Sequence, residues 1–181
     1  MKVTATAMPL YYLAYGSNLH PGRLRRRIFS CRAEGTVSLP GHALRFQKRG
    51  RDSSGKADLL HTGFEGDYAY GVVYRIDRLA KPALDACEQG YRTVHLDLVV
   101  AGKERRVFTY QAEPTTIDAE LLPFSWYKGL VVAGARYHGF PAAYLDRLLA
   151  VAEEADPDPD RQQLHSALLA GLTSLASPPL P

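Results

Sequence analysis

The chain has 181 residues, 46% of them hydrophobic. This is enough for one compact domain whose core needs no disulfide bonds or bound metals for stability. Its formal net charge of +3 is only mildly basic, and its apolar runs are too short for a membrane-spanning helix or a secretory signal. Cys31 and Cys87 stand far apart without a Cys/His cluster, which excludes a disulfide framework and argues against a zinc site, so we expect a cytosolic protein with free thiols.

The first elements in chain order are a short strand and a basic helix. Residues 10–15 are apolar on both faces and predict a buried strand. The chain then passes through a turn at 15–18 into a helix over 21–29, which opens with a proline, a residue favoured in the first turn. We expect Leu24 and Ile28 to face the core from this helix and its arginines to face solvent.

The middle of the chain predicts a series of strands with one short helix. Strands are predicted at residues 43–47, 57–62, 68–76, 93–100 and 105–111. The clearest is 93–100, where apolar and polar residues alternate with the period of a half-buried strand. Residues 83–88 lie between the two groups of strands and predict a helix, with Pro82 in its first turn and Gly90 just past its end.

The last third of the chain is predicted to be helical. Helices are expected at 125–137, 141–154 and 161–172, with an acidic, proline-rich linker at 156–160 and a frayed SPPLP tail. Because the strands mostly precede the helices, the fold class is α+β rather than an alternating parallel sheet. We assign 1–155 to one domain and 156–181 to an appended linker, short helix and tail.

The turn Tyr15-Gly16-Ser17-Asn18 is the first candidate site. Glycine lets a backbone approach a ligand closely, and free amides at the start of a helix favour negative charge. A carboxylate or a developing oxyanion would be held well there. The alternative interpretation is a simple tight turn, capped by Ser17 or Asn18. Ser17 is not in a nucleophile-elbow motif, so we do not assign it as a nucleophile.

The second candidate is the segment LDACEQG at 84–90. Glu88 stands at the end of the predicted helix, where the helix dipole disfavours a negative charge, so it is not there to stabilise the helix. In an apolar site its pKa would rise, as a general base at neutral pH requires. The alternative is an ordinary surface glutamate. We interpret Cys87 as a small buried residue and His42 and His95 as structural, and predict no metal site.

Basic residues gather around 23–32 and 45–51. A nucleic-acid-binding surface would interleave such patches with aromatic residues or carry a fold signature, and neither is visible. We therefore favour a solvated arginine face. An RNA-binding domain is kept as the last alternative, and it predicts steeply salt-dependent binding.

Four stretches combine these candidates in a specific order: YLAYGSNL at 12–19, GVVYRID at 71–77, LDACEQGY at 84–91 and WYKGLVVAGARYHGFPAAYLDRLLAV at 126–151. Together they resemble the γ-glutamylcyclotransferase-like family. The first resembles the family's N-terminal signature, and the next two resemble a strand and the glutamate-bearing segment after it. The fourth resembles the final active-site tyrosine and the two helices that follow. The resemblance extends over residues 10–151.

The resemblance implies a small mixed β-barrel of about six strands with surrounding helices. It also implies a reaction in which the α-amine of a γ-glutamyl group attacks its own γ-carbonyl, releasing 5-oxoproline and an amine without a cofactor. Glu88 would move the protons, and Tyr127 would add a hydroxyl contact. The amides expected to hold the γ-glutamyl group are those of Tyr12, Leu13, Ala14, Tyr15, Gly16 and Ser17. The expected partner is a small γ-glutamyl substrate bound by a monomer or homodimer, with no membrane or nucleic-acid partner.

One departure from the family pattern concerns Gln89, which separates Glu88 from the glycine that usually follows at once. Asp85 is the other carboxylate of the segment, and it fits the family's aspartate position better than that of the base. Two alternatives stay open. One is a γ-glutamylamine cyclotransferase with a lysine or polyamine leaving group, although a basic face would repel a cation. The other is a non-catalytic small-molecule binder of the same fold, of the kind seen among the plant avirulence-induced proteins, which would not need Glu88.

Overall fold

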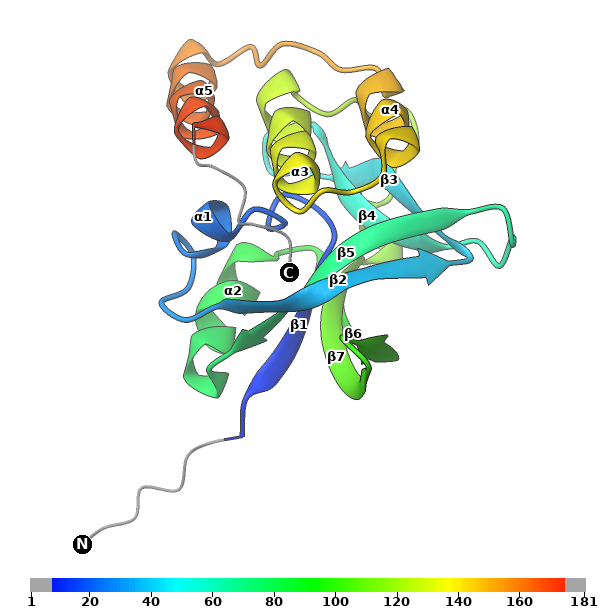
Figure 1. Cartoon of the computed structure of the whole chain (residues 1–181). Helices are drawn as coiled ribbons and strands as arrows, with labels where there is room; N and C mark the ends of the chain where they lie inside the picture. Colours follow the sequence, from blue (N-terminus) through cyan, green and yellow to red (C-terminus); the bar gives the residue numbers. More distant parts are fainter. Residues whose placement is uncertain (1–7, 175–181) are drawn as a thin grey trace, which may run out of the picture.

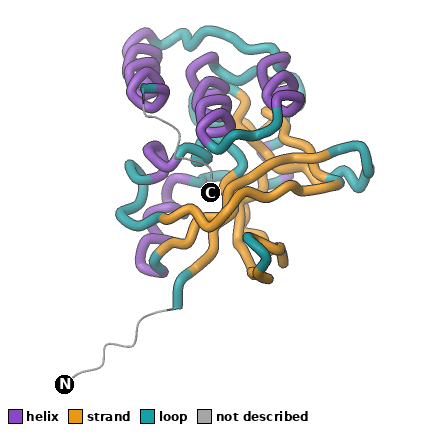
Figure 2. Tube along the Cα trace, viewed as in Figure 1, coloured by secondary structure: helices purple, strands orange, loops and turns teal. Residues whose placement is uncertain are grey.

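The computed structural model describes residues 8–174, and within them the chain forms an α+β fold (Figure 1). The strands are β1 (Leu10–Ala14), β2 (Arg32–Pro40), β3 (His42–Arg49), β4 (Gly55–His61), β5 (Tyr68–Ile76), β6 (Tyr91–Val100) and β7 (Lys103–Ala112). The helices are α1 (Pro21–Leu24), α2 (Lys81–Cys87), α3 (Ser125–Tyr137), α4 (Ala142–Ala150) and α5 (Pro159–Thr173), with short 3-10 turns at Arg78–Ala80 and Pro114–Thr116. Helices α3, α4 and α5 gather at one end of the strands (Figure 2).

The larger sheet has the strand order β2-β5-β1-β7-β6. Strand β1 occupies its centre, antiparallel to β5 and parallel to β7, and β6 and β7 form a hairpin. Because a central strand is covered on both faces, it is apolar throughout, and Leu13 and Ala14 are fully buried. The predicted buried strand near the N-terminus is confirmed. It carries the chain directly to the turn at 15–18.

The second sheet is the β3–β4 hairpin, which is fastened to β7 by side-chain hydrogen bonds. Gln111 donates from Nε2 to the carbonyl oxygen of Leu59 at 3.1 Å, and the amide of Ala112 donates to Asp58 Oδ1 at 2.9 Å. The expected closed barrel is not confirmed, since the described strands pair as two separate sheets. The edge strands β2 and β6 do approach at one end, where a Cβ on Gly35 would lie 3.2 Å from Val100 Cγ1.

Strand β2 was not expected from the sequence. Its residues, RAEGTVSLP, contain only two that are buried, Val37 and Leu39, and they include a glycine and several polar side chains. The strand forms because it pairs along most of its length with β5, with a register shift between Ala33 and Gly35. Long-range pairing therefore outweighs a weak local pattern.

The helix at 125–137 is confirmed to the residue, but two other helices are shorter than predicted. Helix α1 ends at Leu24 rather than near residue 29, because the next backbone hydrogen bonds span three residues, from Arg26 to Arg23 and from Arg27 to Leu24. Helix α4 ends at Ala150 rather than 154, since Val151 has an extended backbone conformation. Glu154 then forms an isolated parallel β-bridge with Phe124. The predicted helix at 83–88 is confirmed as α2, which leaves Glu88 as its C-terminal cap. The interpretation of Cys87 as a buried residue is wrong, since it is exposed at the end of this helix.

Helix α3 lies directly against the loop that leaves the turn at 15–18. A Cβ on Gly134 would lie 2.4 Å from Leu19 Cβ and 2.8 Å from the His20 amide nitrogen, so only glycine allows this approach. Leu130, Val131 and Ala135 of the same helix are fully buried. The turn is thus held between the central strand on one side and α3 on the other.

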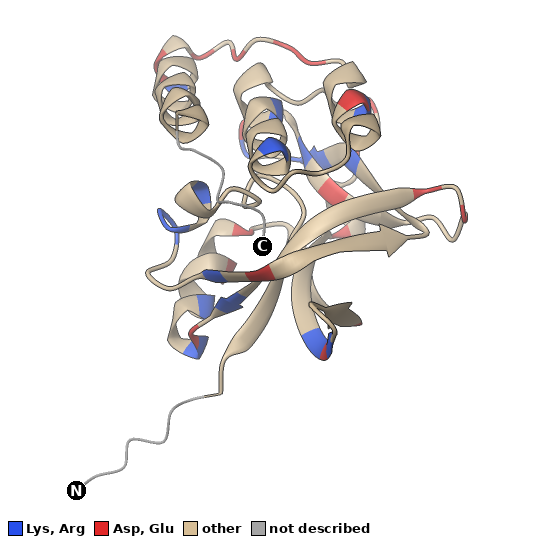
Figure 3. Ribbon diagram, viewed as in Figure 1, with Lys and Arg blue, Asp and Glu red and all other residues tan. Residues whose placement is uncertain are grey.

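Helix α5 packs beside α3 rather than extending into solvent. Trp126 of α3 stacks on His165 of α5, with ring centroids 3.8 Å apart, and Leu172 is buried. Asp156 lies in the connection from α4 to α5, which carries several acidic residues (Figure 3), and it accepts from Trp126 Nε1 at 2.8 Å and from Arg161. The predicted helix at 161–172 is confirmed. The domain boundary after residue 155 stays a prediction, and the SPPLP tail lies outside the described residues.

Candidate active site

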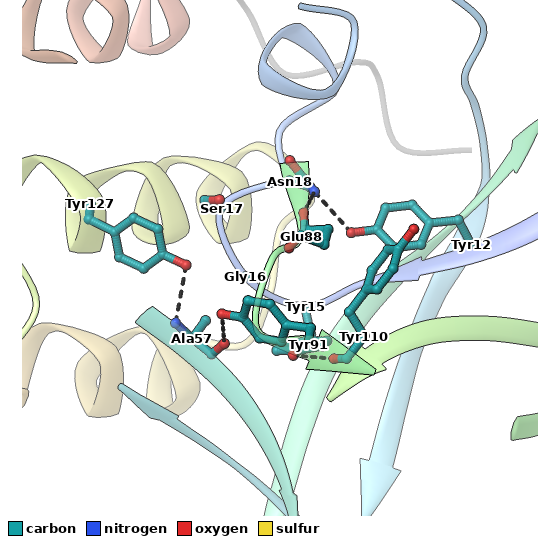
Figure 4. Close-up of a pocket in the computed structure, with 10 residues that line it drawn as sticks. All are labelled: Tyr12, Tyr15, Gly16, Ser17, Asn18, Ala57, Glu88, Tyr91, Tyr110 and Tyr127. Carbon is teal, nitrogen blue, oxygen red and sulfur yellow. Dashed lines mark hydrogen bonds between the residues drawn. The ribbon is translucent and has the colours of Figure 1, made fainter. Parts of the chain in front are cut away.

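The turn after β1 forms one wall of a narrow pocket (Figure 4). It is closed by a hydrogen bond from the Leu19 amide to the Gly16 carbonyl at 3.0 Å. A Cβ on Gly16 would lie 2.8 Å from Ala57 Cβ, so glycine permits the close packing of the turn against β4. The amides of Gly16 and Ser17 donate to no acceptor within residues 8–174. They are therefore available to an anion or an oxyanion.

Glu88 lines the same pocket, beside the turn. As the C-terminal cap of α2, its backbone amide bonds to the Asp85 carbonyl at 3.0 Å, which turns its side chain away from the helix and into the pocket. Only 13% of the side chain is exposed. Its Oε1 accepts from Arg27 Nη1 at 2.9 Å and from Asn18 Nδ2 at 3.0 Å. Within the described part of the chain, Oε2 has no hydrogen-bond partner, so one oxygen is held and the other is free.

Burial and charge act on the Glu88 carboxyl in opposite directions. Burial raises its pKa above that of an ordinary glutamate, and this effect prevails over Arg27 and the hydrogen bond from Asn18, which lower it. Lys48 and Arg23 also lower it from a greater distance. A carboxylate in this balance is more basic than one in water, and its contact with Arg27 favours the charged form.

Tyrosines line most of the remaining pocket: Tyr12, Tyr15, Tyr91, Tyr110 and Tyr127. Burial raises the pKa of each one, so all are neutral hydroxyls at physiological pH. Tyr12 accepts from Asn18 Nδ2 at 3.0 Å. Tyr127 accepts from the Ala57 amide at 3.1 Å, which leaves its own proton available to donate. Figure 4 shows the Tyr127 hydroxyl beside the turn.

The structure brings most of the predicted site residues together. Those that line the one pocket are Tyr12, Tyr15, Gly16, Ser17, Glu88 and Tyr127. Leu13 and Ala14 are fully buried in β1 and are not among the lining residues, so a role for their amides stays a prediction. Asp85 lies outside the pocket, where it accepts from Lys81 and from the Tyr110 hydroxyl. Glu88 is therefore the carboxylate that the segment 84–90 presents to the pocket.

Four further pocket contacts were not assigned from the sequence. Asn18 was considered only as a cap, yet it joins Glu88 to Tyr12. Tyr91 and Tyr110 give no local signal, because aromatic residues in strands usually pack in a core. The expectation that the arginines after Pro21 face outward is wrong for two of them. The Nε of Arg23 is buried, and Arg27 turns inward to Glu88 because α1 ends early and the chain curls back.

The narrow pocket opens into a larger cleft with a volume of about 490 Å³. The two share Ser17, Glu88, Tyr91 and Tyr127. The outer cleft is walled by the α1 region, the β3–β4 turn, the segment 86–89 and helices α3 and α5. Across residues 8–174 there is no cluster of three or more His, Cys, Asp or Glu side chains that would hold a metal ion.

The chain is similar in sequence to known proteins over part of the region that forms this pocket. Residues 69–148 match the model of the AIG2-like family, a span that includes Glu88 and Tyr127. The chain is 28% identical over 146 residues to human γ-glutamylcyclotransferase and 29% identical over 150 residues to the mouse protein, and each alignment covers 77% of both chains. The resemblance to the γ-glutamylcyclotransferase-like family is confirmed. These relatives support a cyclotransferase type of enzyme.

Solved structures show that the γ-glutamylcyclotransferase-like fold extends over nearly the whole described chain. One γ-glutamyl cyclotransferase structure aligns with a TM-score of 0.75 at 21% identity, covering 88% of this chain and 99% of its own. The crystal structure of an uncharacterized human protein aligns with a TM-score of 0.72 at 23% identity, covering 87% and 98%. In the part of the chain that the structure describes, no helix is long and apolar enough to cross a membrane.

Proposed function

We propose that the protein converts a γ-glutamyl amino acid or amine to 5-oxoproline and the free amine, with Glu88 as the catalytic residue. The observation that carries this proposal is the state of the Glu88 carboxylate. It is buried, one oxygen is held by Arg27 and Asn18, and the other has no partner among the described residues, in a pocket that is also lined by Gly16 and Ser17 with their free amides. Burial of a carboxylate without full pairing is costly, and the α-ammonium group of a γ-glutamyl substrate would offset that cost.

The pocket and the cleft suit the two ends of such a substrate. The narrow pocket takes the γ-glutamyl group, whose α-carboxylate or developing oxyanion accepts from the amides of Gly16 and Ser17. The Tyr127 hydroxyl, which already accepts a hydrogen bond from the Ala57 amide, donates a hydrogen bond to the substrate. The wider cleft takes the leaving group. Folding the γ-glutamyl chain so that its amine meets its own carbonyl makes the reaction unimolecular, an advantage of several kcal/mol.

Glu88 carries the protons from the attacking nitrogen to the departing nitrogen. The free Oε2 removes a proton from the substrate's α-ammonium group, and the amine then attacks the γ-carbonyl carbon to form a tetrahedral intermediate. A bond forms between the α-nitrogen and this carbon, and the original amide bond breaks. In total, two protons leave the α-nitrogen and two reach the departing nitrogen, so the carboxylate is regenerated and no net proton is exchanged with solvent.

The deciding experiment is a 5-oxoproline assay on the native chain and on Glu88→Gln. The substrates are a small set of γ-glutamyl dipeptides and γ-glutamyl-ε-lysine. Mass spectrometry separates 5-oxoproline from free glutamate, which a hydrolase would release instead. We expect turnover by the native chain and a loss of at least about 100-fold in Glu88→Gln, because a proton-transfer group is removed while the side-chain volume is kept.

A matched control is Glu104→Gln, which makes the same chemical change at an exposed position of β7, outside the pocket. It should retain native turnover. Full activity in Glu88→Gln would show that another group moves the protons. Release of free glutamate instead of 5-oxoproline would show that the protein hydrolyses the substrate and does not cyclise it. If a folded native chain produced neither compound from any substrate, the binding-protein alternative would take its place.

A further inference from the structure

The outer cleft carries an excess of positive charge on the side where the leaving group would lie. Its cationic lining residues are Arg23, Arg27, Lys48, Arg51, Lys56 and Arg161. Its carboxylates are Asp52 and Glu88. The lining is therefore strongly cationic, although the chain as a whole has a formal net charge of only +3.

Three of these cations are already paired with carboxylates. Arg27 contacts Glu88 at 2.9 Å, Lys56 contacts Asp52 at 2.7 Å, and Arg161 contacts Asp156 at 2.5 Å. Within residues 8–174, no carboxylate lies within 4.0 Å of the charged groups of the other three, which are Arg23, Lys48 and Arg51. The uncompensated charge therefore belongs to three residues that line one cleft.

Gln89 holds two of the three uncompensated cations in place. Its backbone carbonyl accepts from Lys48 Nζ at 2.7 Å, and its side-chain oxygen accepts from Arg51. Lys48 is 6% exposed and also lies 4.8 Å from the centre of the Tyr91 ring. Neutral oxygens fix the positions of these groups without cancelling their charges. The residue that separates Glu88 from Gly90 thus has a definite structural role beside the catalytic carboxylate.

Arg23 is the third uncompensated cation, and part of its guanidinium group is removed from solvent. Its Nε is buried without a hydrogen-bond partner among the described residues. Burial, reinforced by the nearby Arg27, lowers its pKa to about 10, so it stays charged at neutral pH. A buried, incompletely paired guanidinium is costly, and an anionic ligand would relieve that cost.

We propose that the outer cleft selects leaving groups with an anionic side chain, so that the preferred substrates are γ-glutamyl conjugates of acidic amino acids. This inference rests on the proposed cyclotransferase function and defines its substrate class. Such a leaving group carries two carboxylates, its own α-carboxylate and that of its side chain, and Arg23, Lys48 and Arg51 offer it three cations. A polyamine leaving group would meet these same charges with the wrong sign.

The test compares two nearly isosteric substrates, γ-glutamyl-glutamate and γ-glutamyl-glutamine, which differ by one negative charge. The quantity measured is the ratio of their kcat/KM values. We expect the native enzyme to favour γ-glutamyl-glutamate about tenfold at low ionic strength, a modest value for a charge near uncompensated cations at a partly exposed site. The ratio should fall as salt is added, because exposed charges are screened.

Variants identify the residues responsible. Arg51→Gln should lower this ratio severalfold. The ratio should fall even if loss of the contact between Arg51 and Gln89 makes the variant slower on both substrates. Arg45→Gln is the matched control, since Arg45 is an exposed arginine of β3 that does not line the cleft, and it should keep the native ratio. A native ratio of one or less would overturn the inference while leaving the cyclotransferase intact. If Arg51→Gln has the same ratio as the native enzyme, the assignment of the substrate preference to this cleft would be overturned. Absence of turnover on both substrates and the wider set would reject the proposed function itself.

Discussion

Arg27 donates from Nη1 to Oε1 of Glu88 at 2.9 Å and so joins two segments that lie 61 residues apart in the chain. The contact is largely buried, with 19% and 13% of the two side chains exposed. It has two effects on the carboxylate. It supplies a positive charge that opposes the pKa-raising effect of burial, and it occupies one oxygen so that the other is left for the substrate. Arg27 is therefore a positioning residue whose influence on Glu88 can be measured by titration.

The first prediction concerns the pH dependence of kcat/KM in Arg27→Gln. The base must be ionised, so activity is lost as the pH falls through the pKa of Glu88, and burial already places that pKa above the value for an ordinary glutamate. Removal of the positive charge favours the protonated form, which raises the pKa further. The acidic limb of the profile should therefore move to higher pH, with a greater loss of activity at pH 6 than at pH 8.

Arg27→Lys is the control for this shift, because it keeps the charge while changing the geometry. Its acidic limb should stay near the native position even if its maximal rate is lower. A merely structural role for Arg27 would lower activity equally at every pH. An unshifted limb in Arg27→Gln would thus contradict the electrostatic role.

The second prediction concerns the hydroxyl of Tyr127. In Tyr127→Phe the buried amide of Ala57 loses its acceptor, which should cost about 1–3 kcal/mol of unfolding free energy. Loss of the donated hydrogen bond to the substrate should lower kcat/KM by about tenfold. Tyr11→Phe serves as the control, since Tyr11 is only half-buried and its hydroxyl makes no hydrogen bond within the described residues. Chemical denaturation and the 5-oxoproline assay measure the two effects separately, and equal effects in both variants would rule out the assigned contact.

The third prediction concerns the docking of α5. Leu172 is 4% exposed, and a Cβ on Gly22 would lie 2.8 Å from its Cδ2, so this side chain packs against the start of α1. Leu172→Ala should lower the free energy of unfolding by about 2–5 kcal/mol. Leu164→Ala, on the same helix at 67% exposure, should change it by no more than about 0.5 kcal/mol. Urea denaturation followed by circular dichroism makes the comparison, and similar values for both would mean that α5 is not held by this contact.

The turn at 15–18 and Glu88 were singled out from local motifs, whereas Tyr12 and Tyr127 were assigned only from the family resemblance. Glycine and small polar residues between a buried strand and a helix predict an open turn, and a glutamate at a helix end predicts an unusual carboxylate. Both features depend on a few neighbouring positions. Arg27 lacked such a signal, because its inward direction follows from the early end of α1 and from the position of α2, which is set by the rest of the fold.

The same distinction separates the elements that were predicted from those that were not. Strand β6 and helix α3 carry clear periodic patterns, and both were predicted. Strand β2 exposes much of its length and forms through pairing with β5, so its own residues give little indication of a strand. The outer cleft is equally nonlocal, since it brings α1, the β3–β4 turn and α5 together. Its charge depends on which cations find a carboxylate, and that is decided only by the folded structure.

Trp126 is the single tryptophan of the chain, and it lies in the wall of the outer cleft, stacked on His165 and 4.8 Å from the ammonium group of Lys56. The protein therefore contains its own optical probe at the place where a leaving group would bind. Its fluorescence can report ligand occupancy by titration, without a label and without turnover. Because the same indole contacts α5, an emission spectrum taken during unfolding also reports when that helix leaves the surface of α3.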